Sequence, residues 1–175
     1  MLRGRRALLL SALGAASCGL HPVYAPVSGK GTDAPASQLA AIQVGLIPDR
    51  TGQLLRLALQ ERFERSGAAP ARLYDLTVNY AVSSENIGIL QDYASTRVRY
   101  IGRATYTLTT DVPVHTTLTS GSAQALDGLN QFDQQFFAAD QEGETVQRRM
   151  AGQLADEIAL QLAVYFRKRA AAPGG

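Results

Sequence analysis

Cysteine and histidine are scarce in this chain. Its 175 residues include one cysteine, Cys18, and two histidines, His21 and His115. A single thiol has no partner for an intramolecular disulfide, and so few sulfur and imidazole groups exclude a Cys/His zinc cluster. The sequence also lacks a P-loop, an EF-hand spacing and a nucleophile elbow. We therefore expect a protein that has no enzymatic activity and binds no cofactor or metal. The enzymatic alternative is a secreted hydrolase that uses His115.

Long hydrophobic runs and an excess of charge are also missing. An apolar run of about ten residues, at positions 7–16, is too short for a membrane-spanning helix, which needs roughly 20. The chain has 17 Lys and Arg against 15 Asp and Glu, but Arg3, Arg5 and Arg6 precede this run. Without these three arginines the balance is 14 basic to 15 acidic residues. A nucleic-acid partner is therefore not expected, because the chain lacks the excess of positive charge that binds phosphate backbones.

What is present at the N-terminus is typical of an export signal, which we predict over residues 1–17. The arginines form its positive n-region, residues 7–16 form its apolar h-region, and small residues lead up to position 17. We expect this segment to be removed from the mature protein.

Cys18 directly follows those small residues, as in the lipobox of bacterial lipoproteins. A lipobox cysteine carries a diacylglyceryl thioether, and its amine is acylated after cleavage. Buried acyl chain contributes about 0.8 kcal/mol per CH₂, so more than one chain makes anchoring long-lived. We predict an N-acyl diacylglyceryl group on Cys18, and Gly19 favours sorting to the outer membrane. Ala15 replaces the usual Leu-like residue, so secretory cleavage near Ala16 with an incidental thiol is the alternative.

The remainder divides into a tether and one domain. Residues 25–37 are rich in Pro, Gly and Ser and have no apolar periodicity, so we predict a lipidated N-terminus and flexible tether over residues 18–37. A single domain is expected over residues 38–169, followed by a disordered tail over residues 170–175.

Hydrophobic periodicity predicts the fold of this domain. Alternating apolar and polar residues indicate strands within 39–47, 74–83 and 96–109, and a weaker, Thr-rich strand within 114–125. Apolar residues at helical spacing indicate helices over 49–66 and 144–168. This order predicts an α+β fold, with two helices packed on one face of a four-stranded mixed sheet.

Three arginines are the strongest candidates for a binding site. Arg97, Arg99 and Arg103 share the polar face of the third strand, and Arg97 lies about 7 Å from Arg99 at 3.4 Å per residue. Arginine forks match phosphate geometry, so this row could bind an anionic headgroup. The alternative is a solvated sheet face with Glu or Asp on the neighbouring strand.

A predicted connection over residues 83–96 is the second candidate. It carries Ile87, Ile89 and Leu90 near its tip. Exposed apolar residues at a loop tip often mark contact with a lipid or a partner protein. The same residues could instead fold back over the open end of the core.

Four sequence stretches together resemble one family. They are "CGLHPVY" at the cysteine, "DRTGQLLRLALQERF" in the first helix, the paired strands "YDLTVNYAVSSENIGILQDYASTRVRYIGRATYTLT", and the closing "LADEIALQLAVYF". Their order is similar to that of the lipopolysaccharide-assembly lipoprotein family LptE of Gram-negative bacteria, in its alphaproteobacterial form.

The resemblance implies a function and a set of partners. Family members are lipid-anchored at the periplasmic face of the outer membrane. They plug the outer-membrane β-barrel LptD, help it assemble, help deliver lipopolysaccharide to the outer leaflet, and bind lipopolysaccharide. Basic residues near the second hairpin are associated with the lipid's phosphates, and Arg97 and Arg99 are the nearest matches here. A lipid-anchored periplasmic subunit of another lipid-trafficking transporter is the alternative function.

Overall fold

A four-stranded sheet and two long helices make up most of the described chain. The computed structural model describes residues 35–64, 71–89, 95–110, 115–130 and 136–171. In chain order the elements are α2 (Pro35–Ala40), β1 (Ile42–Val44), α3 (Asp49–Glu64), β2 (Tyr74–Ile89), β3 (Ser95–Thr110), β4 (Thr117–Asn130) and α4 (Phe136–Ala171). Cys18 and the expected signal lie outside the described residues.

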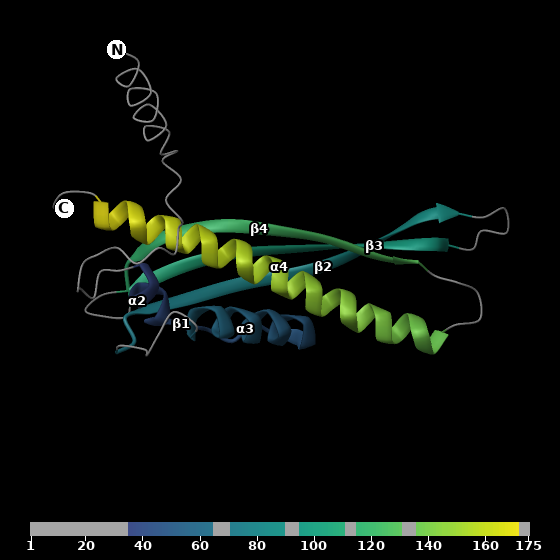
Figure 1. Ribbon diagram of the computed structural model, residues 1–175, viewed down its shortest axis with the longest axis horizontal. Helices are drawn as coiled ribbons and strands as arrows, with labels where there is room; N and C mark the ends of the chain where they lie inside the picture. The colour runs from purple at the N-terminus through teal and green to yellow at the C-terminus, as the bar shows by residue number, and fades with distance from the viewer. Residues whose placement is uncertain (1–34, 65–70, 90–94, 111–114, 131–135, 172–175) are drawn as a thin grey trace, which may run out of the picture.

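The sheet is mixed and has the strand order β1-β2-β3-β4. β1 pairs with β2 in parallel, whereas β2–β3 and β3–β4 are antiparallel. α3 and α4 lie on the same side of the sheet, and α4 crosses the strands diagonally (Figure 1). The predicted α+β class, with two main helices on one face of a four-stranded mixed sheet, is therefore confirmed.

The core forms where the apolar face of the sheet packs against the apolar faces of the helices. On β2, Tyr74, Leu76 and Val78 are buried and alternate with residues on the other face. On α3, Leu55 and Leu59 are fully buried, and α4 contributes a longer stripe of the same kind. Burial of these side chains is the main favourable term in folding, at about 1.5–3 kcal/mol for each large one.

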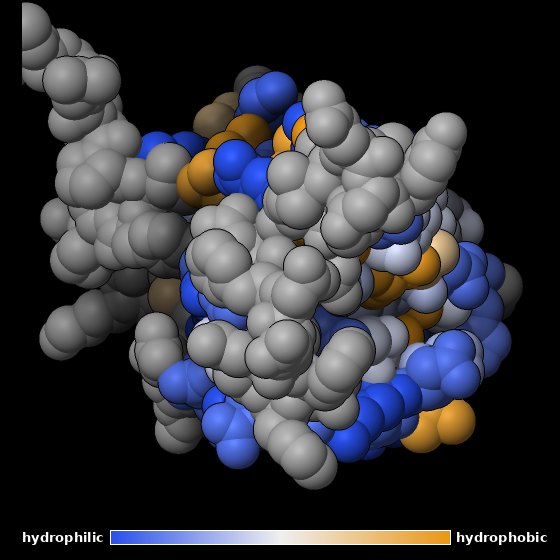
Figure 2. Space-filling model, turned by 90° about the vertical axis from the view of Figure 1, so that its right-hand side faces the viewer, coloured by the Kyte–Doolittle hydropathy of each residue, from blue (hydrophilic) through white to orange (hydrophobic). Residues whose placement is uncertain are grey.

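The molecule is elongated and has two distinct ends (Figure 1). We call the end that holds α2, the start of β2 and the last turn of α4 the proximal end. There the rings of Tyr74 and Phe166 lie 5.2 Å apart, and the Tyr74 hydroxyl donates to Gln38 Oε1 at 2.6 Å. The opposite, distal end holds the end of β2 at Ile89 and the start of α4. Figure 2 looks onto this end, where the described surface is mostly hydrophilic with separate apolar spots.

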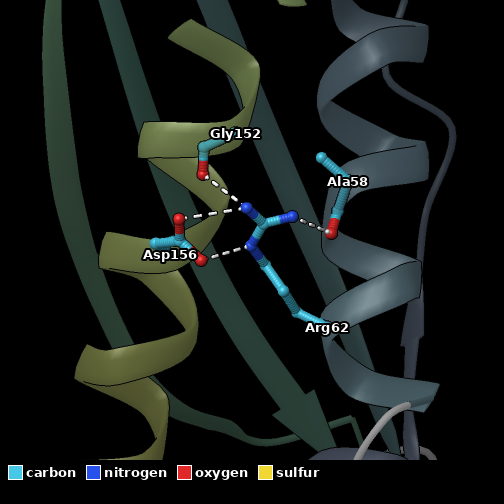
Figure 3. A network of polar contacts seen from close by, with 4 residues as sticks. All are labelled: Ala58, Arg62, Gly152 and Asp156. Atoms are coloured by element: carbon cyan, nitrogen blue, oxygen red, sulfur yellow. Dashed lines mark hydrogen bonds and ion pairs between the residues drawn. The ribbon is translucent and has the colours of Figure 1, made fainter. Parts of the chain in front are cut away.

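Arg62 joins the two helices (Figure 3). Its guanidinium donates to both carboxylate oxygens of Asp156, at 2.5 and 3.0 Å, and to the carbonyl oxygens of Gly152 and Ala58, each at 3.0 Å. Arg50 pairs with Glu144 at 2.7 Å further back along both helices. α3 and α4 therefore run side by side in the same direction.

A tight connection leads into α3. The first residue of the helix, Asp49, has φ 66°, in the left-handed region that Asp tolerates better than most residues. A Cβ atom on Gly52 would lie 2.7 Å from Cγ2 of Ile47, and Gln53 donates a hydrogen bond to the Ile47 carbonyl oxygen. Gly52 thus allows the residues before the helix to pack against its first turn.

Sequence predictions of several element boundaries were wrong. The strand expected over 39–47 is limited to Ile42–Val44, because helix α2 occupies Pro35–Ala40. The connection expected over 83–96 is mostly strand, since β2 continues to Ile89 and β3 begins at Ser95. α4 begins at Phe136 rather than near residue 144. Residues 84–86 of β2 are exposed, so no apolar alternation marks that part of the strand.

Candidate functional site

The sheet face opposite the helices carries the predicted arginine row. Arg97, Arg99 and Arg103 are all exposed there. The neighbouring β3 residues Val98 and Ala104 are buried on the helix side. The alternation predicted for this strand is confirmed, and the three arginines share one face.

Two of these arginines line a hollow near the distal end. Ile87 of β2, Arg97 and Arg99 of β3, and Leu126, Asp127 and Gly128 of β4 enclose a volume of about 400 Å³. We call this the arginine hollow. The register explains its composition, because Ile87 lies opposite Arg97, and Arg99 lies opposite Gly128.

Gly128 forms the floor of the hollow. A Cβ atom there would lie 2.9 Å from the Val98 carbonyl oxygen and 3.9 Å from Nε of Arg97. Any larger residue would therefore push the β3 backbone away and fill the space beside Arg97. Glycine leaves that space open between the two arginines and Leu126, which is 57% exposed.

Glu85 balances part of the positive charge. It lies directly opposite Arg99 on β2, and its Oε2 is 3.9 Å from Arg99 Nη1. Both side chains are about half exposed, and an ion pair of this length in contact with water contributes little to stability. For Arg99 the expected alternative, an acidic residue on the neighbouring strand, is therefore present, although the pair is loose enough for a stronger anion to compete.

Asp127, at the rim of the hollow, is tied to α4. Arg149 donates to its carboxylate at 2.7 and 3.1 Å, and the Gly128 N–H donates to Oδ1 at 2.8 Å. The hydrogen bond from Arg149 is the largest influence on the pKa of Asp127, which is lowered despite the opposing effect of burial. This carboxylate is therefore ionised at neutral pH and already neutralised by its own arginine. Arg97 and Arg99 are the basic residues that line the hollow, and Glu85 lies opposite Arg99.

The other predicted site residues are not brought into the hollow. Arg103 lies opposite Ala81 and Gln124, four residues beyond Arg99 along β3 and outside the hollow. Ile87 is half-buried within β2 and lines the hollow, so it is not part of a loop tip. The side chain of Ile89 and the whole of Leu90 lie outside the described residues, so their expected contact stays a prediction.

Sequence reasoning missed three residues on this face: Ile101, Leu126 and Gly128. Ile101 is 7% exposed although it lies on the arginine face, where it pairs with Ser83 and Leu126. The strand expected over 114–125 is observed as Thr117–Asn130, so it continues past the three β4 residues that line the hollow. The pair Leu126 and Leu129, three apart, gave no alternation that could have extended it.

Comparison with known families decides what kind of protein this is. The sequence model of the LptE family, described as lipopolysaccharide-assembly, matches residues 39–162, which is more than half of the chain. The chain belongs to the LptE family. LptE proteins are lipoproteins of lipopolysaccharide assembly and are not enzymes, so the predicted absence of catalysis is confirmed on this ground. His115, exposed just before β4, makes no hydrogen bond or ion pair with any described residue.

Solved structures support the LptE fold. A protein from Caulobacter crescentus is 19% identical, with a TM-score of 0.61, covering 78% of this chain and 98% of its own. Rare lipoprotein B from Shewanella oneidensis is 12% identical, with a TM-score of 0.55 and coverages of 75% and 98%. A minor lipoprotein from Acinetobacter baumannii is 16% identical, with a TM-score of 0.51 and coverages of 70% and 90%. Comparison with curated protein sequences gives no match.

Two further properties concern the described residues alone. Within the described ranges, no helix has both the length and the apolar character needed to cross a membrane. The same residues contain no group of three or more His, Cys, Asp or Glu side chains placed to hold a metal ion.

Proposed function

We propose that this chain is an outer-membrane lipoprotein of the alphaproteobacterial form of LptE, anchored at the periplasmic face through acylated Cys18. It plugs the β-barrel LptD, helps the barrel assemble, and assists delivery of lipopolysaccharide to the outer leaflet by binding this lipid. The family match over residues 39–162 and the "CGLHPVY" stretch support the assignment.

The observation that carries the proposal is the polar sheet face with the arginine hollow at its distal end. The lumen of an outer-membrane barrel is polar, and a face rich in Thr, Ser, Gln and Arg suits that surface. The hollow adds two guanidinium groups beside an exposed leucine, which together suit a phosphate attached to an apolar lipid. Arginine is well matched to phosphate because its planar fork donates two parallel hydrogen bonds.

The position of the hollow fits delivery across a membrane. From Thr110 at the proximal end to Arg97, β3 spans about 40 Å at 3.3 Å per residue. A bilayer including its headgroups is about 40–45 Å thick. A chain anchored to the inner leaflet and standing inside a barrel would therefore hold the hollow near the level of the outer leaflet.

Capture of lipopolysaccharide tests the role of the hollow. We expect the double variant Arg97→Gln/Arg99→Gln to capture purified lipopolysaccharide about tenfold or more weakly than the unchanged chain, because hydrogen bonds to charged groups contribute about 1.5–3 kcal/mol each. Arg103→Gln is the matched control, since it removes a charge from the same face outside the hollow, and should bind normally. Unchanged capture by the double variant would remove the hollow from the proposal.

A further inference from the structure

The outer edge of β2 lacks a neighbouring strand along most of its length. β1 pairs only with residues 74–76 of β2, and the Gly45 N–H then donates to the Leu76 carbonyl oxygen at 2.9 Å. From Thr77 onward, β3 is the one strand beside β2 in the described part of the chain. Figure 1 shows β2 continuing past β1 toward the distal end. An edge of this kind can pair with a further strand through its backbone.

The pairing pattern shows which backbone groups lie on this edge. In an antiparallel pair, every second residue exchanges hydrogen bonds with the neighbouring strand, and the residues between them point to the other side. Because the Leu76 carbonyl oxygen points toward β1, every second residue after Leu76 also points away from β3. We call the backbone groups of these residues the open edge: Val78, Tyr80, Val82, Ser84 and Asn86. None of these groups has a hydrogen-bond partner among the described residues on that side.

The opposite edge of the sheet, on β4, is capped by side chains. Gln161 of α4 donates to the Ser122 carbonyl oxygen at 3.1 Å. The Gly128 N–H donates to the Asp127 carboxylate, which Arg149 of α4 also binds. The alternation across β3 places both backbone groups on the outer side of β4. α4 thus covers part of the β4 edge, whereas the described chain gives the open edge of β2 no such cap.

The same part of β2 also lacks the features that prevent sheet edges from pairing. Natural edges are blocked by Lys, Pro, bulges or very short strands. Residues 77–89 contain no Lys, Arg or Pro, and Glu85 is their one charged residue. Their described pairs with β3 keep a constant register. A further strand can therefore pair here without displacing a blocking group.

Apolar side chains lie beside the open edge. Leu46 directly follows Gly45 and is 77% exposed, more than any other large apolar side chain in the described ranges. Tyr80 and Val82 are half-buried and pack against the core on the helix side of the sheet. A strand with alternating apolar and polar residues would extend both faces, because its apolar side chains would continue the core and its polar side chains the opposite face.

We propose that the open edge of β2 binds an extended segment of a partner protein as an additional strand. Hydrogen bonds to the backbone from Val78 to Asn86 supply affinity, and the alternation of apolar and polar side chains supplies specificity. This inference goes beyond the proposed function and depends on neither the lipid anchor nor the arginine hollow.

Charge favours a partner protein over a second copy of this chain. An added strand lies about 4.8 Å from β2, so Glu85 is the charged residue of the neighbouring strand that it meets. Two copies of β2 placed edge to edge would bring no basic residue to Glu85, because residues 77–89 contain none. The segment that fits therefore carries Lys or Arg at the position beside Glu85.

Hydrogen exchange of the full chain in detergent, resolved to single residues by mass spectrometry, tests the proposal. The probe is a nine-residue peptide of alternating valine and threonine with one lysine, added in excess. We expect exchange at the amides of Val78, Tyr80, Val82 and Ser84 to slow by about tenfold or more, because each gains a hydrogen bond. The amides of Asn79, Ala81 and Ser83 already bond to β3 and should not change.

Ser84→Pro should lose most of this additional protection, because it removes one N–H from the open edge, where proline is tolerated within a sheet. Ser84→Thr keeps that N–H and is the matched control, which should respond like the unchanged chain. If proline unfolds the strand, Ser84→Lys/Asn86→Lys serves instead, since both positions are exposed and lysines block edge pairing.

Four results would overturn the inference. They are unchanged exchange with the peptide, equal slowing at alternate residues of β2, slow exchange at the open edge before the peptide is added, and slowing that rises with the concentration of the chain alone. The last result would assign the edge to a second copy. None of the four bears on acylation of Cys18 or on capture of lipopolysaccharide, so this inference and the proposed function can fail independently.

Discussion

Two tyrosines in the sheet, Tyr80 and Tyr106, differ in how their hydroxyl groups are satisfied. The Tyr106 hydroxyl donates to Gln161 Oε1 at 2.7 Å, and Gly121 leaves room for the ring. The Tyr80 hydroxyl is buried without a hydrogen-bond partner among the described residues. Burial raises the pKa of both phenols, and the charge of Glu157 raises that of Tyr106 further. Both groups are therefore neutral at physiological pH.

We expect Tyr80→Phe to raise the free energy of unfolding by about 1 kcal/mol, because a buried hydroxyl without a partner loses its hydration and gains nothing in return. Chemical denaturation followed by circular dichroism measures this change. Tyr106→Phe is the matched control and should lower the free energy of unfolding by about 1 kcal/mol, since it removes a formed hydrogen bond. Destabilisation of equal size in both variants would contradict the assignment of Tyr80 as unsatisfied.

At the level of single residues, the sequence predicts the arginines but not their setting. Alternation places Arg97 and Arg99 on one face, and this holds in the structure. The hollow also needs Gly128, whose importance depends on the close approach of the Val98 carbonyl oxygen on the neighbouring strand. No local pattern contains that distance, because it arises only from the pairing of β3 with β4.

Among the secondary-structure elements, the contact between β4 and α4 beside the hollow responds to pH. Asp127 on β4 binds Arg149 on α4, and this hydrogen bond is the main reason why the pKa of Asp127 is lowered. A lowered pKa in the folded state means that the ion pair stabilises the fold above the pKa of the unfolded chain, near 3.9. The stabilisation is lost as pH falls through the folded-state pKa.

Asp127→Asn should therefore lower the unfolding temperature at neutral pH by about 1–3 °C for a domain of this size. The difference between the two proteins should stay constant above the pKa of the unfolded chain and shrink toward zero as pH falls through the lowered folded-state pKa of Asp127. Thermal unfolding followed across this range measures it. A difference that persists unchanged in acid would show that packing, rather than the carboxylate charge, links β4 to α4.

Helices and strands were predictable from the sequence where one face is buried and the other is exposed to solvent. The alternation of Tyr74, Leu76 and Val78 marks β2 because the helices cover one face there. Further along β2, residues 83–86 are all exposed, so both faces are polar and a strand looks like a loop. The six-residue helix α2 is too short to show helical periodicity.

For the whole molecule, the order of elements predicts more than any single motif does. Strand, helix, three strands and helix define the mixed sheet with its two covering helices, and the family match covers this order from residue 39 to residue 162. The two ends of the elongated molecule differ in the elements and side chains that they carry. The proximal end holds α2 and the last turn of α4, and the distal end holds the arginine hollow.

We propose that acylated Cys18 holds this domain at the outer membrane beside a barrel partner, and one isolation tests this proposal. The chain is purified from the outer membranes of its own host, and the mass of its N-terminal peptide and any large protein that accompanies it are determined. We predict a peptide that begins at Cys18 with the added mass of diacylglyceryl and N-acyl groups, together with an outer-membrane β-barrel protein. Cys18→Ala, which cannot be acylated there, should lack both. An unmodified thiol on a chain recovered alone from the soluble fraction would contradict the claim.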